Sequence, residues 1–181
     1  MTLDRRLAGV CGPSLIVGST LYFLFYGPTL GGFGLGDQYW MLTLSVHGLS
    51  ILAIAVGLIG GHAALDLDGW RSRTWWLSTG MAFLGLTLAN IFFALAMLGF
   101  AVIAISIRSL PTGAMLGIGG VFWTYLYLLG VRVGDEDARA RTGGEEVLGL
   151  VAVSLMSLGL IGLGLLGMRH ARTSREQPEL V

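Results

Sequence analysis

The chain has 181 residues, of which 54% are hydrophobic and 12% are charged, and its formal net charge is zero. In soluble domains about 25% of residues are charged, so this composition excludes an ordinary soluble protein. Because the chain carries no net positive charge, a nucleic-acid partner is not expected either.

Five long apolar runs contain no Asp, Glu, Lys or Arg, and every charged residue lies between them or in the tails. A charge at the centre of a bilayer costs at least about 2.5 kcal/mol, and a spanning helix needs roughly 20 apolar residues. The pattern predicts an all-α integral membrane protein, a polytopic bundle of five transmembrane helices with no soluble domain. The predicted spans are residues 7–26, 40–65, 75–107, 113–131 and 147–168. They form one domain, 1–168, followed by a polar C-terminal tail, 169–181, which we expect to be disordered.

The first run, residues 7–26, follows two arginines, as the apolar part of a signal peptide would. No small-residue cleavage pattern ends this run, so we expect a retained transmembrane helix. Tyr22 and Tyr26 near its end are expected to anchor it at one membrane interface, and Trp75 is expected to do the same at the other.

The second run, residues 40–65, places His47, Ser50, Gly57 and Gly61 within one narrow sector of a helix. Small residues let helix backbones approach closely in a bilayer, and Gly57 and Gly61 form the small-xxx-small pair typical of such contacts. These glycines therefore mark a packing face, either within the chain or between the subunits of a homo-oligomer.

Gly113 and Gly117 have the same spacing in the fourth run and are expected to pack in the same way. Leu58 lies outside the sector that holds Gly61. Truncation of Leu58 is therefore expected to disturb helix packing less than a large side chain at position 61.

The third run, residues 75–107, would extend roughly 50 Å as one helix, against a hydrocarbon core of about 30 Å. It is too short for two spans, so it must tilt, project from the membrane, or kink near Gly85 or Gly99. Thr87 and Asn90 give this run a polar sector near its middle. We expect this sector to touch other helices.

Arginine counts predict the orientation of the chain. With five spans, seven arginines lie on the side of the N-terminus and four on the other side. Cytoplasmic loops are enriched in Arg and Lys, so we expect a multi-pass protein of the plasma membrane with a cytoplasmic N-terminus. The tail that carries Arg169, Arg172 and Arg175 would then lie outside, which leaves an even number of spans as an alternative.

Four polar residues within the predicted spans are candidates for binding a ligand: His47, Ser50, Thr87 and Asn90. One interpretation is that they tie helices together by hydrogen bonds. The other is that they line the polar part of a pocket for a small molecule or a quinone. No catalytic residue and no metal site are expected from the sequence.

Haem is the one cofactor considered. His47 and His62 are 15 positions apart, roughly 22 Å along a helix. This spacing is similar to that of the paired haem-ligating histidines of membrane cytochromes b. A second ligand is needed for each haem, and with five spans His170 would face His47. The resemblance implies at most one haem b site within the chain.

The sequence favours a non-catalytic membrane protein, an accessory, assembly or anchoring subunit whose partners are the lipid bilayer and other membrane subunits. The first alternative is a carrier or channel for a small neutral or lipophilic molecule. The second is a haem-bearing redox subunit. Hydrolytic activity is not expected, since no GxSxG motif occurs and no carboxylate lies at membrane depth.

Overall fold

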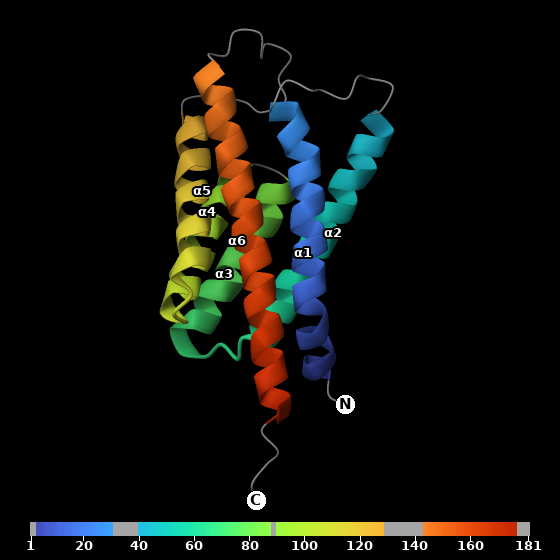
Figure 1. The fold of residues 1–181 in the computed structure, drawn as a ribbon, viewed down its shortest axis with the longest axis vertical. Helices are drawn as coiled ribbons and strands as arrows, with labels where there is room; N and C mark the ends of the chain where they lie inside the picture. The colour runs from blue at the N-terminus through green and yellow to red at the C-terminus, as the bar shows by residue number, and fades with distance from the viewer. Residues whose placement is uncertain (1–2, 31–39, 88–89, 129–142, 177–181) are drawn as a thin grey trace, which may run out of the picture.

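The computed structural model describes residues 3–30, 40–87, 90–128 and 143–176, which are almost entirely helical (Figure 1). Within these residues there are six helices and no strand. They are α1 (Leu3–Leu30), α2 (Trp40–Ala64), α3 (Gly69–Thr87), α4 (Asn90–Ser106), α5 (Leu110–Leu128) and α6 (Gly143–Glu176). Three of them contain segments long and apolar enough to cross a membrane: Arg6–Tyr26, Leu44–Ala64 and Gly144–Thr173. The helical membrane-type bundle is thus confirmed, although not as five spanning helices.

The prediction of one helix over residues 75–107 is wrong, because the chain reverses direction within this range and forms the two helices α3 and α4. The two helices pack against each other, and α3 brings Gly85 directly against the backbone of Phe93 on α4. Their 19 and 17 residues extend about 28 and 25 Å, slightly less than the hydrocarbon core. An uninterrupted apolar run therefore contains a helical hairpin.

The end of the predicted last helix also differs. Helix α6 continues from Gly143 to Glu176, so it includes most of the polar tail that was expected to be disordered. The rest of that tail, residues 177–181, lies outside the described residues.

The six described helices form an up-and-down bundle. Each helix contacts the next along the chain and runs antiparallel to it, and α6 packs on α1. The seam between α2 and α3 is the least extensive contact between sequential helices. Because the number of helices is even, the start of α1 and the end of α6 lie at the same end of the bundle (Figure 1).

Glycines bring the helices close together. A Cβ atom on Gly57 would lie 2.6 Å from Leu15 Cγ, and one on Gly61 would meet the Trp75 ring. On α5, a Cβ atom on Gly113 would lie 3.0 Å from the carbonyl oxygen of Ala101, whereas Gly117 has only an ordinary contact with Ala101. All these contacts are made within one chain.

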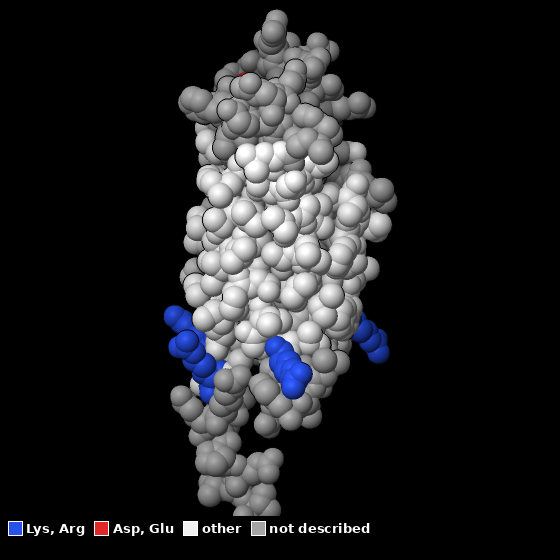
Figure 2. Space-filling view, turned by 90° about the vertical axis from the view of Figure 1, so that its right-hand side faces the viewer, with Lys and Arg blue, Asp and Glu red and all other residues white. Residues whose placement is uncertain are grey.

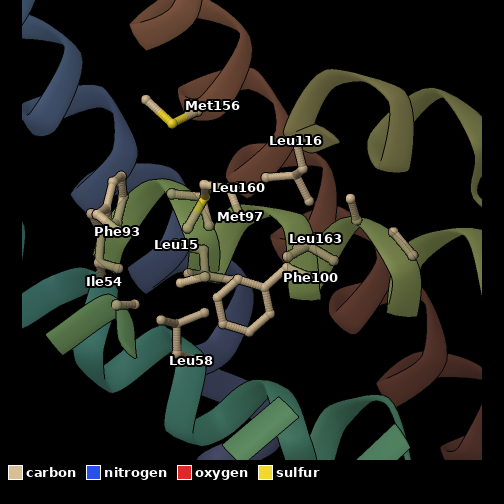
Figure 3. Close-up of a cluster of buried hydrophobic side chains, with 14 of the residues drawn as sticks. Leu15, Ile54, Leu58, Phe93, Met97, Phe100, Leu116, Met156, Leu160 and Leu163 are labelled. Atoms are coloured by element: carbon tan, nitrogen blue, oxygen red, sulfur yellow. The ribbon is translucent and has the colours of Figure 1, made fainter. Parts of the chain in front are cut away.

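Helix α4 supplies much of the core. Its Phe93, Met97 and Phe100 side chains are fully buried and lie among side chains of four other helices (Figure 3). The surrounding residues are Leu15 of α1, Ile54 and Leu58 of α2, Leu116 of α5, and Met156, Leu160 and Leu163 of α6. A helix that is buried on most of its sides has an almost continuous apolar sequence. For this reason the sequence gives no sign of where α3 ends and α4 begins.

Charge is confined to the ends of the bundle. Figure 2 shows arginines around the end of the bundle where α1 begins and α6 ends, while the body above them carries no charge on this face. Large apolar side chains are exposed on this body, among them Val17, Leu52 and Val102. An apolar belt bounded by a basic end is typical of a protein surrounded by lipid.

Candidate functional site

Six ring side chains from four helices meet in the half of the bundle farther from the start of α1 and the end of α6. We call them the aromatic–histidine cluster: Tyr22, Phe25 and Tyr26 of α1, His47 of α2, Phe93 of α4 and Trp123 of α5. The His47 ring stacks on Phe25, with centroids 4.3 Å apart and planes 22° apart. It also meets the edge of Tyr26 at 5.8 Å and interacts with the backbone of Leu86, near the end of α3. His47 is thus held between three helices.

Tyr22 and Tyr26 extend the cluster into the bundle. They are one turn apart on α1, which places them on the same face, with ring centroids 4.7 Å apart. Tyr22 packs on Phe93 at 5.0 Å, and Tyr26 meets the edge of Trp123 at 6.1 Å. The expectation that Tyr22 anchors the helix at the interface is wrong, because its side chain is 0% exposed.

A second feature is a set of buried hydroxyl groups, which we call the hydroxyl layer. Its members are Ser19, Tyr22, Ser50, Thr79 and Ser157, all at most 4% exposed. Among the described residues, none of their side-chain oxygens has a hydrogen-bond partner, and neither does Nδ1 of His47. A buried polar group without a partner costs about 1–3 kcal/mol, so six such atoms in one small protein need an explanation.

Hydroxyls near the outside of the bundle behave differently. Thr20, Thr87, Thr124 and Ser154 each donate a hydrogen bond of 2.7–2.8 Å to the carbonyl oxygen four residues earlier in their own helix. Any serine or threonine in a helix can form this bond. The inward hydroxyls do not form it, so they remain available to groups inside the bundle.

Contacts between α1 and α2 place Tyr22 and Ser50 at one level. Gly18 meets Ile54 on one side of the level, and Phe25 stacks on His47 on the other. Between these two contacts, antiparallel pairing sets Tyr22 opposite Ser50. The hydroxyl layer therefore borders the aromatic–histidine cluster.

Ser157 and Thr79 lie close to the same level. On α6, Gly164 packs against Gly12 and Leu15 of α1, so Ser157, two turns earlier, lies level with Ser19 and Tyr22. On α3, Trp75 donates to the carbonyl oxygen of Leu58, and Thr79 lies one turn farther towards Leu86. Four helices thus contribute hydroxyls to one layer.

The structure brings two of the four predicted ligand-binding residues together. His47 belongs to the aromatic–histidine cluster, and Ser50, one turn along α2, belongs to the hydroxyl layer that borders it. Thr87 is exposed at the end of α3 and donates to the carbonyl oxygen of Phe83, so it does not join them. Asn90 is the first residue of α4, and its side chain lies outside the described residues.

Sequence reasoning missed Ser19, Tyr22, Thr79 and Ser157 as site candidates. In the sequence, a serine or threonine that bonds its own helix looks identical to one that points inward without a partner, and Tyr22 looks like an interfacial tyrosine. On α5, Trp123 is buried, whereas Tyr125 and Tyr127 are exposed.

The haem pairing of His47 with His170 is wrong. Near the end of α6, a Cβ atom on Gly167 would lie 3.3 Å from Cβ of Ala64, so His170 belongs to the end that holds His62. The even number of helices returns α6 to that end. His62 pairs with Ser72 Oγ at 2.7 Å, and Nδ1 of His170 lies 3.1 Å from the carbonyl oxygen of Leu166.

Within the part of the chain that the structure describes, no three His, Cys, Asp or Glu side chains form a group that could hold a metal ion. Comparisons with protein-family models, with curated proteins and with solved structures find no match. The function is therefore argued from the cluster and the hydroxyl layer.

Proposed function

We propose that this chain is an integral membrane protein that binds a small neutral or lipophilic molecule inside its helical bundle, as a carrier or channel for that molecule would. The observation that supports this is the hydroxyl layer beside His47, with six buried polar atoms that lack partners among the described residues. A bound molecule with polar atoms would satisfy these groups. Its remaining surface would pack on the rings of the cluster.

Neutrality of the molecule follows from the surroundings. The described charged residues lie at helix ends, such as Arg71 at the start of α3, or in the connections between helices. An ionised ligand at the level of Tyr22 would meet no opposite formal charge there. Its transfer out of water would then be strongly unfavourable.

Native mass spectrometry of the whole protein, purified in a mild detergent, tests the proposal. The wild-type protein should retain a small molecule. His47→Phe keeps a flat ring against Phe25 but removes both nitrogens, so we expect about threefold to tenfold less bound molecule, the effect of one lost hydrogen bond. His170→Phe, at the other end, is the control and should retain the molecule fully. A wild-type protein without a bound molecule would contradict the proposal.

We also propose that both ends of the chain face the cytoplasm, in the plasma membrane. Six helices put eight arginines on the side of the termini: Arg5, Arg6, Arg71, Arg73, Arg108, Arg169, Arg172 and Arg175. Only Arg132, Arg139 and Arg141 fall on the opposite side, in the segment that joins α5 to α6. This asymmetry is larger than the one found with five spans, and it favours cytoplasmic termini.

A green fluorescent protein fused after Val181 should therefore fluoresce, and alkaline phosphatase at the same place should be inactive. The same reporters fused after Leu128, the last residue of α5, should give the opposite result. Active phosphatase after Val181 would instead support the five-span arrangement with an external tail.

An accessory or assembly role is the second candidate. The outward face of α2 supports it, because it exposes a row of large apolar side chains: Leu42, Leu44, Leu49, Leu52, Val56 and Ile59. Such a face suits a neighbouring membrane helix as well as lipid. A stoichiometric protein that co-purifies with the chain, without any small molecule, would favour this role over the first.

A further inference from the structure

We infer that the molecule bound inside the bundle is a flat, neutral compound with carbonyl oxygens, of the quinone class, which accepts hydrogen bonds from the hydroxyl layer. The inference rests on the proposed function and specifies the ligand of the same site. Three properties of the site support it: its hydrogen-bond donors, its flat rings and its entrance.

The hydroxyl layer supplies hydrogen-bond donors. Each hydroxyl of the layer carries one proton, and Tyr22, Ser50 and Ser157 are buried without an acceptor among the described residues. A carbonyl oxygen has two lone pairs, so it can accept from two such hydroxyls at once and needs no donor in return. Two carbonyl oxygens on one ring could satisfy hydroxyls from opposite sides of the layer.

The aromatic rings of the cluster indicate that the rest of the ligand is flat. Tyr22 and Phe93 form a tilted pair at 5.0 Å, and Phe25 and His47 form a stacked pair at 4.3 Å. Aromatic faces prefer offset or edge contacts with other flat π systems. The side chains of Met97 and Met156, also fully buried, add polarisable apolar surface at this depth. A sugar or other polyol would leave many hydroxyls facing this apolar lining, whereas a quinone ring would not.

The seam between α2 and α3 offers an entrance from lipid. It is the least extensive contact between sequential helices, and its two helices carry Ser50 and Thr79. His47 lies farther along it, next to Leu86. A molecule dissolved in the bilayer could reach the layer through this seam without crossing the charged end.

The test compares duroquinone with durene. Both are flat six-membered rings with four methyl groups at the same positions, and duroquinone has two carbonyl groups where durene has two ring C–H groups. Their binding to the whole detergent-solubilised protein is measured by isothermal titration calorimetry. We expect duroquinone to bind at least about tenfold more tightly than durene, as two hydrogen bonds would allow. Equal affinities would overturn the inference.

Matched variants locate the hydrogen bonds. Ser157→Ala and Tyr22→Phe remove inward hydroxyls, and each should weaken duroquinone binding about threefold to tenfold without changing durene binding. Ser154→Ala, on the same helix as Ser157, and Tyr125→Phe remove outward hydroxyls and should change neither. Unchanged duroquinone affinity in both inward variants would also overturn the inference. Thermal unfolding of each variant checks that it is folded.

Failure of this inference can be distinguished from failure of the proposed function. If neither ring binds but the purified protein still retains a molecule that depends on His47, the quinone class is wrong and the binding function stands. If neither ring binds and nothing is retained, both are wrong.

Discussion

Gly85→Ala should lower the free energy of unfolding by about 3 kcal/mol, the upper range for overpacking a well-packed core. A Cβ atom at this position would lie 2.5 Å from Cα and from Cβ of Phe93 and would also contact the Phe93 backbone nitrogen. Backbone atoms cannot rotate away as a flexible side chain can. The added methyl group therefore has to separate α3 from α4, and Phe93 would leave its place against Tyr22.

Gly80→Ala is the matched control on the same helix. Gly80 is exposed, and a Cβ atom on it would meet nothing within 4 Å. Alanine should stabilise the helix there by up to about 1 kcal/mol. Thermal unfolding of both variants in detergent should thus give shifts of opposite sign. If Gly85→Ala were as stable as Gly80→Ala, the close approach of α3 and α4 would be refuted.

Trp75→Ala should destabilise the protein by about 3–5 kcal/mol, the usual cost of removing a buried aromatic side chain. Trp75 is 0% exposed. Its Nε1 donates a hydrogen bond of 2.9 Å to the carbonyl oxygen of Leu58, and its ring meets the edge of Phe100 at 4.9 Å. This one side chain therefore joins α3 to α2 and to α4.

The neighbouring Trp76 provides the control, since it is 46% exposed and only packs beside His62. Trp76→Ala should change stability by less than about 1 kcal/mol. Trp75→Phe should fall between the two alanine variants, because it keeps an aromatic ring but loses the hydrogen bond. Equal melting temperatures for Trp75→Ala and Trp76→Ala would show that Trp75 is not a core residue.

The expectation that Trp75 anchors its helix at the membrane interface is wrong, because the side chain is 0% exposed. Leu58 lies outside the sector that holds Gly61 and is nevertheless buried. In the bundle α2 is contacted by α1, α3 and α6, so its buried surface is wider than the glycine stripe. Leu58 is 1% exposed, and its truncation should cost about 2–5 kcal/mol.

The sequence by itself determined the class of the protein. Charge-free apolar runs predict membrane helices because an unpaired charge in hydrocarbon is costly, and small residues such as Gly57 and Gly61 identify faces where backbones approach. It also pointed to His47 and Ser50, since polar residues within an apolar run are few and conspicuous.

Only the tertiary structure decided the number of helices in the described residues, the end of the bundle at which α6 finishes and the composition of the site. The reversal between Thr87 and Asn90 follows from the packing of α3 on α4. An apolar run carries no signal for it, because the exposed sides of the two helices, with Leu84 and Val102, are as apolar as their buried sides. The hydroxyl layer is likewise a property of packing. Whether a serine bonds its own helix, as Ser154 does, or points inward without a partner among the described residues, as Ser157 does, depends on which face its neighbours cover.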